Sequence, residues 1–243
     1  AKASGFNTMF LFTLHFQPNG DVYYNDTLVV SNGIYVGDPT WGASLATLRP
    51  AINRIELVIA SYGDPSFAYI QNLVATNGTE PGSILYQDFL ALKNATGVDA
   101  IQYDDEQTYD VSSSVALGSM IAGLGMKVTF VPYTRQDYWT AVKSQLGTNV
   151  DAIYLQCYDG GAGNDPAQWN AAFGGFLYRR GGSGRHVVQT GHFATVDADK
   201  VGMARFAFRR PAPLEAVEVI ADFQPPHQAD FGQVAQVAKD SRL

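Results

Sequence analysis

Acidic side chains follow an apolar run in the segment 97–106, and their types and spacing could support acid–base chemistry. Successive side chains of an extended strand point to opposite faces, so Gln102, Asp104 and Glu106 would share one face. Two carboxylates on that face lie about 6.5 Å apart, at roughly 3.3 Å per residue. Like charges at this range raise one pKa, and a carboxylic acid that stays protonated near neutral pH can act as a general acid. A solvated acidic turn after a strand is the alternative interpretation.

The spacing of these acids resembles the fourth-strand motif of glycoside hydrolase family 18, Asp-x-x-Asp-x-Asp-x-Glu. Asp99, Asp104 and Glu106 match its first, third and fourth acidic positions, while Gln102 stands at the second. Asp105 occupies the place of the aromatic residue common in chitinases. The Asp-Asp-Glu triplet is therefore similar to the endo-β-N-acetylglucosaminidase branch of the family.

Two further segments carry the resemblance, which covers about residues 6–178. Residues 150–159 form an apolar run that ends in Gln156-x-Tyr158-Asp159, similar to the family's sixth-strand motif. Residues 57–64 resemble the third-strand motif Ser-x-Gly-Gly, with Asp64 in place of the last glycine. The interval from Glu106 to Tyr158 leaves room for two strand–helix units. Three partial motifs in the family's order support the resemblance more than any one of them.

These segments need a scaffold, and the periodicity of the sequence predicts an α/β fold with a parallel sheet. The resemblance implies that this fold is a (β/α)8 TIM-type barrel formed by residues 1–243 as one catalytic domain. Two Asn-Gly pairs predict the turns of a hairpin insertion between Asp21 and Val36. We expect strands at 6–16, 28–36, 55–61, 98–104, 126–132 and 151–158, and helices at 66–76, 84–94, 113–124 and 138–146.

The last quarter of the chain has a different composition, so the last two strands of the barrel are its least defined part. All 13 Tyr and all 3 Trp precede residue 179, and residues 179–184 have the composition of a linker. The eighth-strand Trp of the family has no counterpart here. We expect Val187–Gln189 and Val217–Ile220 to supply strands seven and eight, with the eighth pairing with strand one at residues 10–14 and a helix at 231–239 closing the chain.

Composition favours a folded domain and excludes some partners. The chain has 243 residues, 46% of them apolar, and a net charge of −7. This charge argues against nucleic acid and anionic membranes as partners. The short apolar run at 9–14 is interpreted as the first barrel strand, since no cleavage site follows it. The sequence shows no zinc-ligand cluster or phosphate-binding loop, so we predict no metal and no cofactor, and Cys157 alone can form no intrachain disulfide.

The resemblance implies a retaining reaction in which the substrate's own acetamido oxygen attacks the anomeric carbon. In that reaction Glu106 would protonate the leaving oxygen and later activate water. Asp104 would hold the acetamido N–H, and Tyr158 would donate a hydrogen bond to its carbonyl oxygen. The resemblance thus implies an N-acetylglucosamine-containing oligosaccharide or glycoprotein glycan as partner, and a secreted or cell-surface location.

Further substrate-binding residues are expected near this centre. Tyr62 ends a strand on the side where barrel active sites lie. Trp41 could stack on a sugar ring from a loop, although an aromatic side chain is more often part of the core. His15 is expected to be a satisfied interior histidine. The full set of expected substrate-binding residues is Gln102, Tyr62, Asp159, Gln156 and Trp41.

A second function stays open beside hydrolysis. Gln102, Ala100, Asp64 and the missing Trp favour a catalytically impaired member that binds glycans as a lectin or inhibitor. Asp104, Glu106 and Tyr158 together favour the enzyme. The residues do not separate chitin from the chitobiose core of N-glycans, and hydrolysis of another sugar on the same scaffold is a third possibility.

Overall fold

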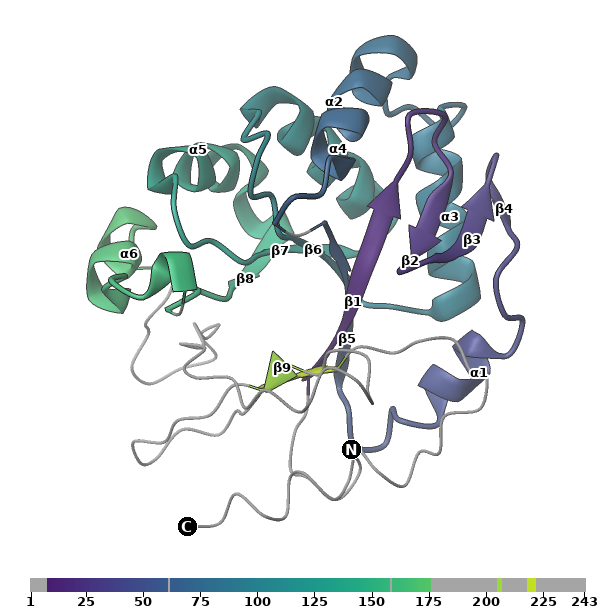
Figure 1. Cartoon of the computed structure of the whole chain (residues 1–243), viewed down its shortest axis with the longest axis horizontal. Coiled ribbons are helices and arrows are strands. Elements are labelled where there is room, and N and C mark those ends of the chain that lie inside the picture. Colours follow the sequence, from purple (N-terminus) through teal and green to yellow (C-terminus); the bar gives the residue numbers. More distant parts are fainter. Residues whose placement is uncertain (1–7, 61, 158, 176–204, 207–217, 222–243) are drawn as a thin grey trace.

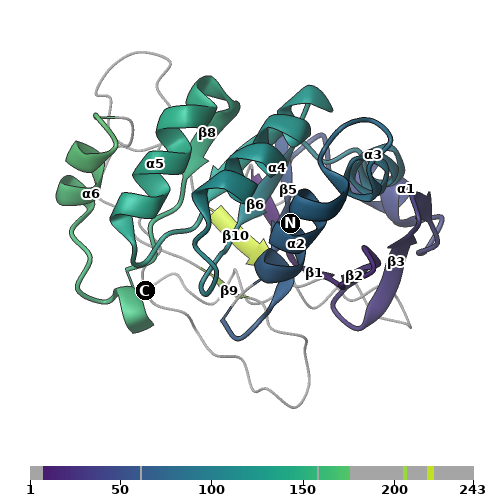
Figure 2. The same cartoon turned by 90° about the horizontal axis from the view of Figure 1, so that it is seen from above.

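The protein is described by a computed structural model that covers residues 8–60, 62–157, 159–175, 205–206 and 218–221. Within these ranges the chain is a mixed α/β structure with one sheet and six α-helices. Figures 1 and 2 show helices α2 to α5 gathered along one side of the sheet.

The sheet has the order β4-β3-β2-β1-β5-β6-β7-β8, with β10 beside β1 and β9 beside β10. Its strands are β1 Thr8–Phe16, β2 Val22–Tyr24, β3 Thr27–Ser31, β4 Ile34–Tyr35, β5 Arg54–Ile59, β6 Ala100–Tyr103, β7 Lys127–Phe130, β8 Val150–Ile153, β9 Arg205–Phe206 and β10 Glu218–Ala221. The helices are α1 Trp41–Ala46, α2 Ser66–Asn77, α3 Ile84–Thr96, α4 Val111–Gly123, α5 Gln136–Leu146 and α6 Pro166–Ala172, with 3-10 turns η1 Gly147–Asn149 and η2 Asp159–Gly161.

The centre of the sheet is parallel, as the alternation of strand and helix patterns predicted. Strands β1, β5, β6, β7 and β8 pair in parallel in that order. Helices α2 and α3 connect β5 to β6, α4 connects β6 to β7, and α5 connects β7 to β8. All four predicted helices are confirmed, while the short helices α1 and α6 were not predicted.

Local signals explain where the helices before and after β6 begin and end. The Ser83 side chain accepts a hydrogen bond from the N–H of Tyr86 and starts α3. Gly97 has φ 66° and ends α3 in the left-handed conformation, immediately before β6. Asp110 accepts from the N–H of Ser113 at 2.8 Å and starts α4. These local signals thus determine where α3 ends before β6 and where α4 begins after it. The segment between β6 and α4 holds the predicted acids.

The two faces of the parallel sheet differ in what they bury. One face packs against the helices and forms the main apolar core. The opposite face, called the inner face below, carries a smaller apolar cluster of Phe10, Val58, Ala152 and Tyr154 with Phe12 beside it. Because side chains alternate along each strand, polar residues next to helix-facing positions also point to the inner face.

The run at 28–36 is not the second parallel strand. It forms β3 and part of the antiparallel β2–β3–β4 insertion, whose turns place Asn25 and Asn32 at φ 50°. Strand β5 pairs directly with β1, for example Leu11 with Leu57. The Asn-Gly turns thus set the local pairing, as predicted, and the predicted acids follow the third strand of the series β1, β5, β6 rather than the fourth.

A closed barrel is not confirmed. Among the described strands, no pairing joins β8 to β9 or β10, so the sheet stays open there. The predicted parallel pairing of 217–220 with strand one is confirmed, and β10 lies beside residues 8–11, slightly nearer the start of β1 than expected. The antiparallel β9 was not predicted. The expected strand at Val187–Gln189 and the helix at 231–239 lie outside the described residues.

Candidate functional site

The acids of the predicted motif stand just beyond β6, which ends at Tyr103. The backbone N–H of Asp104 still donates to the carbonyl of Ile59 at 3.2 Å, after which the chain turns away from the sheet. Asp104 is 4% exposed, whereas Glu106 is half-buried. The strand spacing of about 6.5 Å expected for these two carboxylates therefore does not apply, because Glu106 lies outside extended backbone.

Gln156, in the segment after β8, brings the two carboxylates together. Its Nε2 atom lies 3.1 Å from Asp104 Oδ1 and 3.3 Å from Glu106 Oε1. The same nitrogen lies 2.9 Å from the carbonyl oxygen of Val131. A carboxamide has two hydrogens, so three acceptors share them. The segments that follow β6, β7 and β8 therefore converge on one buried amide.

Asp105 points elsewhere and has a structural role. Its carboxylate accepts backbone hydrogen bonds from Gln107, Thr108 and Tyr109, at 3.1, 2.9 and 2.7 Å, and a further one from the Tyr138 hydroxyl at 3.2 Å. Burial raises the pKa of Asp105, and these four hydrogen bonds oppose the shift. The middle acid of the triplet thus shapes the turn that presents Glu106.

An aromatic group beside Glu106 was missed by the sequence analysis. The rings of Tyr109 and Tyr138 meet edge to face at 5.4 Å, and the Arg135 guanidinium carbon lies 5.5 Å from the Tyr109 ring centre. Burial raises the pKa of Tyr109, with the Tyr133 phenol and the nearby carboxylates, Glu106 included, adding to the shift. These tyrosines lie at no position of the family motif. Only the structure shows that the segment after β6 and the start of α5 bring them together.

The loop after Gln156 fixes the backbone of Gln156, and with it the position from which the side-chain amide extends. Asn164 Nδ2 donates to the carbonyl oxygen of Gln156 at 2.9 Å and to that of Tyr133 at 2.8 Å. A Cβ atom on Gly161 would lie 2.3 Å from the Gln156 carbonyl oxygen. Only a glycine fits so close to that backbone, so the loop requires glycine here for packing.

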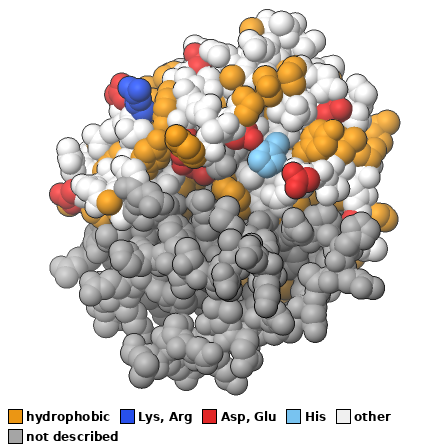
Figure 3. All heavy atoms as spheres, in the orientation of Figure 1, with side chains coloured by type: hydrophobic (Ala, Val, Ile, Leu, Met, Phe, Trp, Pro, Cys, Tyr) orange, Lys and Arg blue, Asp and Glu red, His pale blue; other side chains and the backbone are white. Residues whose placement is uncertain are grey.

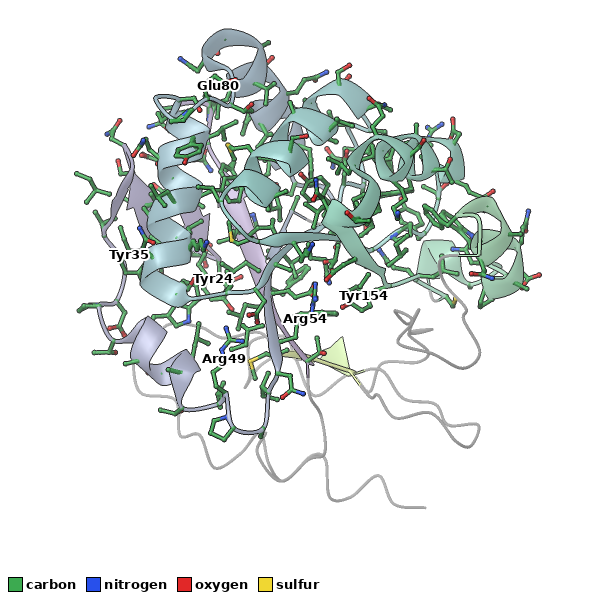
Figure 4. All side chains as sticks on the ribbon, turned by 180° about the vertical axis from the view of Figure 1, so that it is seen from behind. Tyr24, Tyr35, Arg49, Arg54, Glu80 and Tyr154 are labelled. Carbon is green, nitrogen blue, oxygen red and sulfur yellow. The ribbon has the colours of Figure 1, made fainter. Side chains whose placement is uncertain are left out.

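A second polar group lies on the inner face around Glu56, and no motif predicted it. Glu56 is completely buried, yet four side chains from β5, β6, β7 and the segment after β8 donate to its carboxylate. The donors are Arg54, Gln102 at 3.1 Å, Thr129 at 2.5 Å and Tyr154 at 2.9 Å. Arg54 also pairs with both carboxylate oxygens of Asp151, at 2.9 and 2.7 Å. Figure 4 shows Arg54 and Tyr154 close together on the side of the sheet away from the helices.

Gln102 belongs to this Glu56 group. Its side chain is 2% exposed, and its amide donates to the neighbouring strand. Gln102 was expected to bind substrate, but the structure commits its amide to the interior. Buried polar groups are normally satisfied in this way, and a second carboxylate so close to Glu56 would be costly.

Other expected binding residues divide between the two ends of the sheet. Tyr62 is 83% exposed in the loop between β5 and α2, at the same edge as Asp104. Trp41 begins α1 and packs on Tyr24, with ring centres 4.9 Å apart, against the helix-side core. Trp41 thus contributes to core packing while it stays partly exposed, and its role in sugar stacking stays a prediction. Tyr158 and the side chain of Asp159 lie outside the described residues.

His15 is not the fully satisfied interior residue that was expected. It lies near the carboxyl end of β1, with 29% of its side chain exposed, and its Nδ1 atom contacts Asp64 Oδ2. Figure 3 shows a histidine side chain at the surface with acidic side chains around it. The carboxyl edge of β1, β5, β6 and β8 therefore gathers His15, Asp64, Asp104, Glu106 and Gln156.

Comparison of the chain with models of known protein families, with curated proteins and with solved structures found no match. Within the described part of the chain, no three His, Cys, Asp or Glu side chains are grouped so as to hold a metal ion. The helices of that part are too short or too polar to cross a membrane.

Proposed function

We propose that the chain is a retaining glycoside hydrolase related to family 18, which cleaves β-1,4-linked N-acetylglucosamine in chitin or N-glycan cores. The observation that carries the proposal is the Gln156 amide within hydrogen-bond distance of both Asp104 and Glu106. Two carboxylates held side by side, one buried and one half-exposed, suit a division into an orienting and a proton-transferring group.

In the proposed reaction Glu106 donates its proton to the leaving glycosidic oxygen as the bond to the anomeric carbon breaks. The substrate's acetamido oxygen forms the new bond to that carbon, and Asp104 accepts a hydrogen bond from the acetamido N–H. Water then opens the resulting oxazolinium ion, and the proton it loses returns to Glu106. Tyr158 keeps the role that the resemblance implies, as a donor to the acetamido oxygen.

The same proposal includes a closed barrel as the fold of the chain. A (β/α)8-type barrel would use both edges of β1, which pairs in parallel with β5 and with β10. Its carboxyl edge would hold the substrate, as in other barrels. A secreted or cell-surface location, with a glycan as partner, would accord with this substrate.

The proposal is tested by exchanging the proton donor. Glu106→Gln keeps the shape of the side chain but cannot transfer a proton, so kcat should fall by about a hundredfold or more while binding persists. Glu80→Gln is a matched control, because Glu80 is exposed in the turn between α2 and α3, at the top of Figure 4 and away from Tyr154. Products from chitooligosaccharides and from a high-mannose glycoprotein would be measured by mass spectrometry. Unchanged turnover in a folded Glu106→Gln protein would exclude Glu106 as the acid.

The second candidate is a glycan-binding lectin or inhibitor without turnover. It is favoured by the bond from Gln102 to Glu56, which leaves an amide where the family has a carboxylate behind Asp104. The same assay separates the two candidates. Binding of either glycan by the wild-type chain with no product would support the lectin.

A further inference from the structure

We infer that His15, held by Asp64, is a further substrate-binding residue at the carboxyl edge, where its Nε2 atom binds a sugar hydroxyl. This inference rests on the proposed function, since it concerns the same glycan. It adds a side chain from β1 to a site that otherwise comes from β6 and the segment after β8.

The direction of the His15 ring follows from its neighbours on β1. Leu14 and Phe16 both belong to the helix-side core and are at most 1% exposed. Since side chains alternate along a strand, His15 between them points to the inner face. This is the face that carries the Glu56 group and Asp104.

Strand register places His15 near Asp104. Leu14 pairs with Ile59 on β5, and Ile59 pairs with Tyr103 on β6. His15 and Asp104 each follow these partners by one residue, so they stand two strands apart. At about 4.8 Å for each strand, their backbones lie roughly 10 Å from one another, about the width of a disaccharide unit.

The contact with Asp64 fixes the imidazole and decides which nitrogen is available. Asp64 Oδ1 accepts the backbone N–H of Ser66 at 2.8 Å, and the Ser66 hydroxyl accepts the N–H of Phe16 at 2.8 Å. Burial works to raise the pKa of Asp64, but the hydrogen bonds from His15 and Ser66 hold it below its usual value. An ionised Asp64 requires hydrogen on Nδ1, so Nδ1 is committed to this contact and Nε2 is the ring nitrogen that can bind a ligand.

The Nε2 atom of His15 belongs to a side chain that is exposed enough to bind a ligand, and it has room for a hydrogen bond. Among the described residues it makes no hydrogen bond, and the side chain is 29% exposed. Tyr62, two residues before Asp64, is 83% exposed on the same loop. The same loop thus carries the carboxylate that orients His15 and an exposed aromatic ring, and hydrogen-bonding atoms and aromatic rings are the groups that bind the hydroxyl groups and the apolar face of a sugar.

Two substitutions test the roles of the Nδ1 and Nε2 atoms of His15 separately. His15→Asn retains a donor at the place of Nδ1 and removes Nε2, whereas His15→Gln retains a polar atom near Nε2 and removes Nδ1. Both would be made in a Glu106→Gln background, which prevents turnover, and titrated with a chitotetraose and with a high-mannose glycopeptide in a calorimeter. Thermal unfolding would be recorded for each variant.

We expect His15→Asn to bind roughly five- to tenfold more weakly, with an unfolding midpoint near that of its parent. His15→Gln should melt lower and keep more of the affinity. In the active enzyme, His15→Asn should raise KM and leave kcat within about twofold.

Equal binding by His15→Asn and its parent, with only His15→Gln less stable, would show that the His15–Asp64 contact only links β1 to the loop before α2. That result would overturn this inference and leave the proposed function standing. If the parent binds and cleaves neither probe, the proposed function fails and this inference fails with it. If a His15 variant does not fold, NMR of the parent protein tests the inference instead. The His15 imidazole signal should shift when the glycan is added, and an unchanged signal would count against the inference.

Discussion

Gln102 and Glu56 form a hydrogen bond between adjacent strands, with Nε2 of Gln102 3.1 Å from Oε2 of Glu56. Both side chains are buried on the inner face, and Gln102 lies two residues before Asp104 of the proposed catalytic pair. The glutamine thus satisfies a charge supplied by β5. The carboxylate at this place in the sheet therefore comes from β5, and β6 supplies an amide.

Gln102→Glu should therefore destabilise the protein rather than improve it. Two carboxylates within hydrogen-bond distance in the interior raise one pKa, so the folded variant holds an extra proton. Its stability deficit should be small below about pH 4 and reach roughly 2–4 kcal/mol at neutral pH, because ionisation costs most in the folded state. Urea unfolding at two pH values would measure this. Gln107→Glu, at an exposed position, is the control and should be nearly neutral.

Gly161→Ala should disturb Gln156 through contact with its carbonyl oxygen, 2.3 Å from the added Cβ. Relieving the overlap moves backbone, at a cost of about 1–3 kcal/mol, and should lower kcat/KM at least tenfold on an active substrate. Gly163→Ala is the matched control in the same loop, since its Cβ would meet nothing within 4 Å. Calorimetry and initial rates would be compared. Equal behaviour of the two variants would contradict the packing role.

Asp88 gives stability a pH dependence of its own. It is fully buried on α3, its Oδ1 accepts the N–H of Gly33 at 2.7 Å, and its Oδ2 has no partner among the described residues. Burial raises its pKa from 3.8 to about 6. Since the folded pKa exceeds the unfolded one, protonated Asp88 contributes stability that is lost as the pH rises from about 4 through 6.

Asp88→Asn should remove that dependence. Relative to wild type, the variant should gain about 2 kcal/mol between pH 4.5 and 7.5, because its amide never ionises. Urea unfolding of both proteins at both pH values gives the double difference, in which other titrating groups cancel. A wild-type-to-variant gap that stays constant with pH would contradict the assignment.

Tyr138→Phe should weaken the turn that presents Glu106. The Tyr138 hydroxyl contacts Asp105 Oδ2 at 3.2 Å and Ser114 Oγ at 2.7 Å. Its loss leaves both partners less satisfied in the interior and should cost about 1–3 kcal/mol. Tyr69→Phe on the partly exposed face of α2 is the control. Equal thermal midpoints for the two variants would show that the backbone donors alone satisfy Asp105.

The sequence predicted the parts of the fold that local chemistry controls. The helix after Ser83 and its end at Gly97 depend on a cap and a left-handed glycine, both visible in the sequence. Gln156 was expected near Asp104 and Glu106, because parallel strands bring their carboxyl ends to one edge, but the contacts of its amide with both carboxylates were not predicted. The hairpin insertion followed from its Asn-Gly turns.

Long-range pairing could not be predicted in the same way. Residues 28–36 and 55–59 have similar apolar patterns, and only the tertiary structure decides which run lies beside β1. Glu56 lies in an otherwise largely apolar strand, and three of its four donors come from later segments. Trp41 had no pattern to separate core packing from sugar stacking.

Strand β1 is shared by three neighbours: β5 along one edge, and β2 and β10 at opposite ends of the other. During synthesis β1 leaves the ribosome first and β10 long afterwards, so the amino-terminal half of that edge waits unpaired while nearly all of the described chain is made. An unpaired apolar edge is a template for strands of other molecules. A chain that stops before Glu218 should therefore self-associate more than the chain of 243 residues does, which light scattering would measure.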